Sequence, residues 1–146
     1  MALRYADHLK NCKKHKPSCP PDEFGPTTRV AFRFMRKPAN EREFDPPPVK
    51  NGGIKKGDTC TRLALSFFES LPGARKKFKE LDARVDARDR YGTHIGEIKL
   101  KTSDGLAGPP GYLTHFDLHQ AVAAEFHNRV TAYHDLPAED DDDDAA

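Results

Sequence analysis

The amino-terminal segment contains two cysteines and two histidines within twelve residues, in the spacing His8-x3-Cys12-x2-His15-x3-Cys19. Thiolates and neutral imidazoles are the ligands that structural zinc sites prefer. Such sites usually hold two ligand pairs on either side of a longer loop, whereas here Pro17 separates Cys19 from the other three residues. Two interpretations therefore stay open, a zinc site or scattered polar residues on a basic arm.

A second concentration of histidines lies between residues 113 and 136, at His115, His119, His127 and His134. A helix over residues 116–133 would place His115 and His119 one turn apart on one side. Such a pair can chelate a metal, with Asp117 or Glu125 supplying oxygen ligands. The zinc-protease motif is absent because no Glu follows the first His. The alternative is that these histidines are structural residues with hydrogen-bond partners.

Common catalytic and nucleotide-binding motifs do not occur in the chain. Ser66 and Ser70 lack the Gly-x-Ser-x-Gly elbow, and Cys60 lacks the local signature of a cysteine protease. Neither a Gly-x4-Gly-Lys-Ser/Thr phosphate loop nor a Gly-x-Gly-x-x-Gly turn is present. Any chemistry must therefore come from residues that the fold brings together.

Two segments have clear patterns of regular structure. Residues 28–35 alternate apolar and polar side chains, which predicts a strand with Arg33 pointing away from the Val/Phe face. Residues 63–68 are apolar and also alternate, so a strand is preferred there, although a short helix fits nearly as well. Ser70 is a favourable N-cap for a following helix. The apolar side of that helix is formed by Ala74, Phe78, Leu81 and Val85.

Together these patterns predict an α+β fold with a small mixed or antiparallel sheet and two main helices. The second helix is the one predicted over residues 116–133, and a further strand is predicted at 93–101. The domain spans residues 28–136. A basic, Pro-rich arm (1–27) with little core of its own precedes it, and a disordered acidic tail (137–146) follows it.

Charge is distributed unevenly along the 146 residues. The net charge is +1, and without the six consecutive acids at 139–144 it would be +7. Residues 1–20 carry five bases and one acid. These ends are either solvated segments or contacts for partners of opposite charge, with the acidic tail a candidate site for a partner protein.

The three cysteines, Cys12, Cys19 and Cys60, cannot all pair within one chain. No apolar stretch has the length of a signal peptide or a membrane span, so no membrane association is predicted. The simplest prediction is a cytoplasmic, reducing setting with free or metal-bound thiols.

The order of these segments resembles the ADP-ribosyltransferase-like fold. A strand bearing Arg33 is followed by a strand bearing Ser66, then by a helix and a strand bearing Glu97. The resemblance implies that Arg33 holds the phosphates or ribose of NAD and that the Ser66 hydroxyl supports the nicotinamide site. It assigns the third, polarising role to Glu97 or to His115. The Glu97-Ile98-Lys99 sequence stands where the family has Gln/Glu-x-Glu.

Two hypotheses for function follow. The first is an NAD-binding domain that transfers or hydrolyses ADP-ribose, with Arg33 and Ser66 lining one cleft and Glu97 or His115 across it. The alternative is a non-catalytic accessory module that binds nucleic acid or protein and holds zinc through the N-terminal Cys and His residues. In that case the basic arm and residues 75–79 contact phosphates, and aromatic side chains stack on bases.

Overall fold

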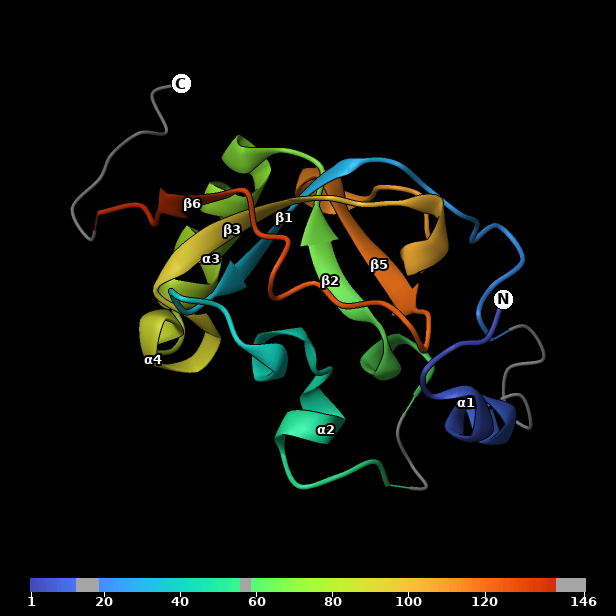
Figure 1. The fold of residues 1–146 in the computed structure, drawn as a ribbon. Helices are drawn as coiled ribbons and strands as arrows, with labels where there is room; N and C mark the ends of the chain where they lie inside the picture. Colours follow the sequence, from blue (N-terminus) through green and yellow to red (C-terminus); the bar gives the residue numbers. More distant parts are fainter. Residues whose placement is uncertain (13–18, 56–58, 139–146) are drawn as a thin grey trace.

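The computed structural model describes residues 1–12, 19–55 and 59–138. In this part of the chain six strands form one antiparallel sheet in the order β4-β5-β2-β1-β3-β6, as Figure 1 shows. The strands are β1 (Val30–Met35), β2 (Leu65–Phe68), β3 (His94–Lys99), β4 (Gly105–Ala107), β5 (His115–Gln120) and β6 (Ala132–Asp135). The predicted α+β class is confirmed, and the sheet is the antiparallel alternative.

The helices are α1 (Ala6–Cys12), α2 (Pro47–Lys50), α3 (Leu71–Asp82) and α4 (Ala87–Tyr91), with short 3-10 helices η1 (Glu41–Phe44), η2 (Thr61–Leu63), η3 (Thr102–Asp104) and η4 (Tyr112–Thr114). The long helix α3 begins as the sequence predicts, because Ser70 Oγ accepts a hydrogen bond from Gly73 N at 3.1 Å. Among the described residues, no helix is long and apolar enough to cross a membrane.

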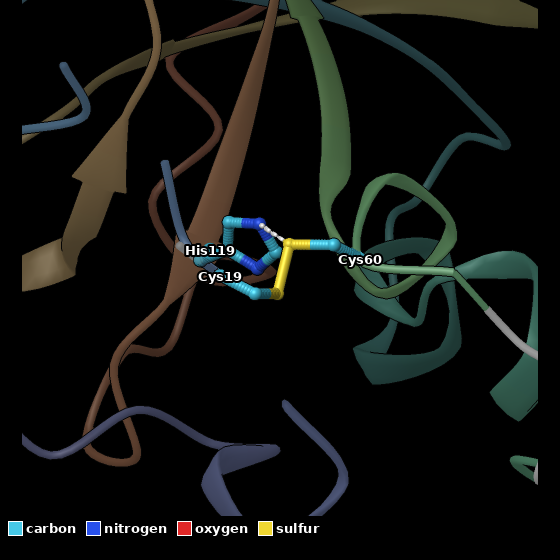
Figure 2. Close-up of side chains that lie close together, drawn as sticks. All are labelled: Cys19, Cys60 and His119. Carbon is cyan, nitrogen blue, oxygen red and sulfur yellow. Dashed lines mark hydrogen bonds between the residues drawn. A yellow bond between two sulfur atoms is a disulfide. The ribbon is translucent and has the colours of Figure 1, made fainter. Parts of the chain in front are cut away.

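The described parts of the amino-terminal arm pack against the sheet. Leu3 forms a β-bridge with Ala121 at the end of β5, and Leu9 is buried. A disulfide joins Cys19 to Cys60, immediately before η2 (Figure 2). The arm therefore contributes its own small apolar cluster, which the sequence did not suggest. At the other end Pro137, assigned to the tail by the sequence, is buried, and its oxygen accepts a hydrogen bond from Arg88. The rest of the acidic tail, residues 139–146, lies outside the described residues.

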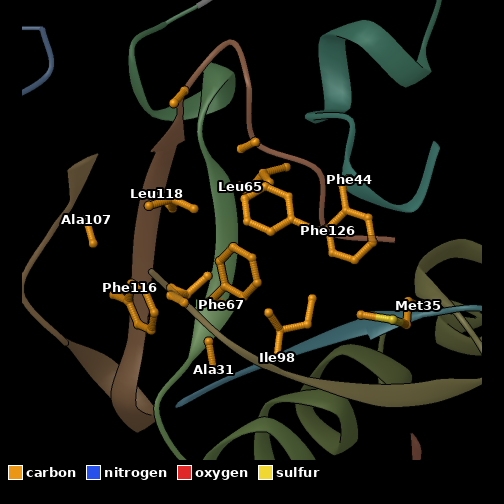
Figure 3. Packing of buried hydrophobic residues seen from close by; sticks show 13 residues of the cluster. Ala31, Met35, Phe44, Leu65, Phe67, Ile98, Ala107, Phe116, Leu118 and Phe126 are labelled. Atoms are coloured by element: carbon orange, nitrogen blue, oxygen red, sulfur yellow. The ribbon is translucent and has the colours of Figure 1, made fainter. Parts of the chain in front are cut away.

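The main core lies on the face of the sheet that carries Ala31 and Met35 of β1, which are fully buried (Figure 3). Aromatic residues fill it, and the Phe126 ring lies 5.3 Å from that of Phe44. Phe32 and Phe34 of β1 project to the opposite face, against a smaller cluster that includes residues of α3. Both faces of β1 are therefore covered, whereas its pattern predicted one buried face.

The helix predicted over residues 116–133 is wrong, since this segment forms β5, an irregular connection and β6 (Figure 1). Phe116 and Leu118 are buried where β5 pairs with β2. Val122 fits the helical spacing but is 57% exposed. Pairing with β2 gives β5 both backbone hydrogen bonds and burial of its apolar side chains. These tertiary interactions outweigh the helical spacing of apolar residues in the segment. Among the described residues, α3 is therefore the one long helix, where the sequence predicted two main helices.

The prediction that His115 and His119 together chelate a metal is also wrong, because both residues lie on the strand β5 and not on a helix. Four residues apart on a strand, their Cα atoms are about 13 Å from each other at a rise of about 3.3 Å per residue. Glu125 is exposed in the connection that follows β5. The two histidines therefore take part in separate clusters.

Candidate functional site

A pocket of about 430 Å³ lies where β1 and β2 separate. The two strands pair with each other at Phe32 and Phe68. Beyond this position Phe34 and Ser66 do not pair with each other, and both border the pocket. Figure 1 shows the strands close together at one end and apart at the other. Residues of α2, α3 and α4 border the gap. Of these helices, α2 lies in the connection between β1 and β2.

The lining of the pocket is strongly basic. Five of its residues are cationic, namely Arg33, Lys50, Arg62, Lys77 and Arg90. Among the described residues that line it, Asp45 is the one carboxylate. Phe34, Phe68 and Tyr91 provide aromatic surface beside these charges. A concave site with concentrated positive charge and apolar walls is suited to a small anion that carries a planar or apolar group.

Arg33 is the central cation. Its Nε donates to the backbone oxygen of Glu43 at 3.0 Å, and its Nη1 donates to the backbone oxygen of Ser66 at 2.9 Å. Burial lowers the pKa of the guanidinium to about 10, which leaves it charged at neutral pH. Within the described part of the chain it forms no ion pair with a carboxylate and Nη2 has no hydrogen-bond acceptor. Its hydrogen bonds therefore go to neutral carbonyls, while the nearby carboxylates of Glu43 and Asp45 oppose the effect of burial on its pKa.

Lys50 adds a second charge close to Arg33. Burial is the main cause that lowers the pKa of its ammonium group, and repulsion from Arg33 acts in the same direction. Glu43 and Asp45 oppose this shift. A bound anion would reduce the repulsion between the two cations, so their proximity favours anion binding.

Ser66 and His115 also border the pocket. Because Ser66 lies two positions from Phe68 on β2, its side chain is on the α3 side of the sheet, whereas Arg33 leaves β1 with Ala31 and Met35 on the other side. The contact between Arg33 and Ser66 thus involves the Ser66 backbone and not its hydroxyl. The two side chains project from opposite faces of the sheet, contrary to the prediction that they line one cleft together, and they border the same pocket because it spans the gap between β1 and β2.

His115 lies beside a carboxylate, with Nε2 3.6 Å from Asp117 Oδ1. Burial lowers the pKa of His115 despite the opposing effect of Asp117, and burial raises the pKa of Asp117. Ser66 pairs with Asp117 across the two strands, so serine, histidine and aspartate occupy one face of the sheet.

Glu97 is not brought to the pocket. Its Oε1 lies 2.8 Å from His134 Nε2, which ties β3 to β6. Glu97 is opposite Phe32 in the pairing of β1 with β3, away from the gap between β1 and β2. Of the two residues that the family resemblance offers for the third role, the pocket includes His115.

Of the zinc set predicted at the amino terminus, the structure describes the side chains of His8 and Cys19. Cys19 is bonded to Cys60, so in this oxidised form neither residue is the free or metal-bound thiol that the sequence predicted. His8 is exposed, while His15 and the Cys12 side chain lie outside the described residues. The prediction of a cytoplasmic setting was based on free or metal-bound thiols. A disulfide is typical of oxidising compartments, so the cysteines no longer support that prediction.

The sequence pointed to Arg33, Ser66 and His115, and to Lys77 as part of the basic residues 75–79, but missed Lys50, Arg62 and Arg90. Lys50 comes from the connection after β1, Arg62 from η2 and Arg90 from α4. None belongs to a spaced motif, because separate turns of the chain bring them together. Only the excess of lysine and arginine outside the acidic tail signalled a basic surface.

No family model, curated protein or solved structure matches this chain.

Proposed function

We propose that the pocket binds a small ligand that carries one or more phosphate groups, with Arg33 as its main cation. The observation that carries the proposal is the state of Arg33, a charged and partly buried guanidinium whose hydrogen bonds go to backbone carbonyls. A guanidinium in this state can make charge-assisted hydrogen bonds to phosphate oxygens with little rearrangement.

Lys50 and the aromatic surface support a ligand of nucleotide type. Lys50 lies near enough for Arg33 to lower its pKa, so one diphosphate could contact both cations. Tyr91 and Phe34 line the pocket on the α3 side of the sheet, where the Tyr91 ring lies 6.4 Å from that of Phe34 and offers a surface on which a base can stack. A pocket of about 430 Å³ is within the usual size of small-molecule sites.

Within this proposal NAD or ADP-ribose is the first candidate ligand, as the resemblance to ADP-ribosyltransferases suggests. Transfer or hydrolysis of ADP-ribose is the corresponding candidate activity. His115, with Asp117 beside it, would be the polar pair nearest to the reacting ribose, because Glu97 is engaged with His134. Binding is the primary claim, and catalysis depends on it.

The test is thermal unfolding of the full chain with pyrophosphate, ADP-ribose, NAD or a short oligonucleotide. Phosphate-bearing small molecules are expected to raise the unfolding temperature of the wild type, since a ligand that binds the folded state stabilises it. The effect should fall in Arg33→Gln and Lys50→Gln. Arg84→Gln is the matched control, because Arg84 is exposed and does not line the pocket.

Three outcomes would count against the proposal. One is the absence of stabilisation by any of the small phosphates, and another is an equal response in the pocket variants and in Arg84→Gln. The third is stabilisation by the oligonucleotide alone, which would favour the nucleic-acid-binding module.

A further inference from the structure

A second cluster of reactive side chains lies outside the basic pocket. It consists of Cys19, Cys60 and His119, whose ligand atoms are all within 4.8 Å of one another (Figure 2). Cys19 lies in the amino-terminal arm, Cys60 precedes η2 and His119 belongs to β5. All three are buried, with 1%, 6% and 3% of their surfaces exposed, respectively.

The imidazole of His119 is directed at the disulfide. Its Nε2 is 3.7 Å from Cys60 Sγ, and this is its one hydrogen-bonding contact among the described residues. Its ring also lies 5.7 Å from that of Phe24, which covers it on one side. A buried histidine whose ring nitrogen lies this close to two cysteine sulfurs can act as a zinc ligand together with them once the sulfurs are thiolates.

We propose that reduction of the Cys19–Cys60 disulfide creates a zinc site in which Cys19, Cys60 and His119 are the ligands. A dithiol reductant supplies two electrons and two protons, becomes a disulfide itself and leaves two thiols on the protein. Zn²⁺ then displaces one proton from each thiol and binds the two thiolates and the imidazole. Two thiolates and one imidazole are a known zinc donor set, with a fourth position for water or another ligand.

The backbone already holds the two cysteines close together, as both the disulfide form and the reduced, zinc-bound form require. The Cα atoms of Cys19 and Cys60 are 5.9 Å apart, and Leu9 and Leu63 pack with the two cysteines in one apolar cluster. The disulfide and the zinc ion would each hold the arm against η2, so the cross-link persists in both redox states. Arg62 of η2, two residues after Cys60, lines the basic pocket.

This site differs from the N-terminal spacing of histidines and cysteines, with which it shares only Cys19. It includes Cys60 and His119, which lie 41 and 100 residues further along the chain. The distinction can be tested because the two sets predict opposite effects of substituting Cys12 and Cys60.

The experiment is a cobalt titration of the metal-free full chain, before and after reduction with a phosphine. Co²⁺ replaces zinc and gives a thiolate-to-cobalt charge-transfer band. The reduced wild type is expected to develop this band at one equivalent and to lose it when zinc is added. The oxidised protein should show no band. This comparison needs no variant, and circular dichroism of both forms establishes whether the reduced chain is folded.

Variants then identify the ligands. Cys60→Ser and His119→Gln are each expected to weaken metal binding by at least about tenfold, and Cys12→Ser should leave it unchanged. The proposal is overturned if the reduced wild type binds no cobalt, whether it stays folded or unfolds. It is also overturned if Cys12→Ser abolishes binding while Cys60→Ser and His119→Gln retain it, since the ion would then occupy the N-terminal set.

Discussion

Arg33 Nη1 donates a hydrogen bond to the backbone oxygen of Ser66 at 2.9 Å, across the gap where β1 and β2 separate. The bond holds the two strands at the edge of the pocket and fixes the guanidinium there. Because it uses the Ser66 backbone, the hydroxyl has no part in positioning Arg33. The roles of the two residues can therefore be separated by mutation.

Ser66→Ala is expected to change the affinity for pyrophosphate by less than about twofold, because the bond from Arg33 to the backbone remains. If the Ser66 hydroxyl supports a nicotinamide group, the same variant should weaken NAD binding. Titration calorimetry with both ligands measures the difference. A loss of pyrophosphate affinity as large as that of Arg33→Gln would show that the hydroxyl contributes to the phosphate site itself.

Lys50 is expected to make the proposed phosphate binding sensitive to pH. Its pKa is lowered by burial and by Arg33, so it loses its charge at a lower pH than an ordinary lysine. Affinity for pyrophosphate is expected to decline as pH rises above neutral, and the decline should begin below the ordinary lysine pKa of 10.5. Lys50→Gln should bind more weakly at neutral pH and show a flatter profile. Identical pH profiles for the two proteins would exclude a role for the Lys50 ammonium.

Gly73 couples α3 to the turn before β5. A Cβ at this position would overlap the backbone oxygen of Leu113 and lie 2.8 Å from Thr114 Oγ1. Leu113 and Thr114 already have φ values of 55° and 65°, so this turn has little freedom to move. Gly73→Ala is therefore expected to lower the free energy of unfolding by about 1–3 kcal/mol.

The usual effect of this substitution in a helix has the opposite sign, a gain of about 1 kcal/mol. Gly25→Ala is the control, since nothing lies within 4 Å of the added carbon and the change should be small. Chemical denaturation measures both variants. A Gly73→Ala protein as stable as the wild type would show that η4 adjusts freely.

His119 makes the fold sensitive to acid. Burial lowers its pKa from 6.5 to about 4. The unfolded chain therefore binds the proton more tightly, so stability is lost as pH falls from 6.5 towards 4, with no further loss below that range. The difference between a pKa of 6.5 and one of about 4 corresponds to at most roughly 3–4 kcal/mol.

The measurement is chemical denaturation of the wild type and of His119→Gln between pH 6.5 and pH 4. The comparison separates the contribution of His119 from that of His115, whose pKa is also lowered by burial. The wild type should lose more stability than the variant on acidification. Equal losses would show that His119 is not protonated on unfolding in this range.

The sequence predicted the elements whose local patterns agree with their tertiary environment. β1, β2 and α3 were predicted because their alternation and the Ser70 N-cap match what the fold buries. The segment of β5 and β6 was not, because apolar residues four apart there also suit a helix and only pairing with β2 decides between the two. Propensity within a short segment is a weak guide where a neighbouring strand supplies the burial.

The residues of the candidate site, like the elements of the fold, could be predicted from the sequence only in part. Arg33 was identified because a charged residue on a regular strand has a direction that alternation predicts. Lys50 and Arg90 lie in short helices whose placement depends on the path of the chain after β1 and α3. The Cys19–Cys60 pairing spans 41 residues, and no local spacing specifies it.

Titration calorimetry of ADP-ribose into the wild type, Arg33→Gln and Arg84→Gln tests the central claim most directly. Removal of charge-assisted hydrogen bonds worth about 1.5–3 kcal/mol predicts affinity about 10- to 100-fold weaker in Arg33→Gln than in the wild type. Arg84→Gln should bind as the wild type does. Folded Arg33→Gln with wild-type affinity, or a wild type that does not bind, would contradict a phosphate site centred on Arg33.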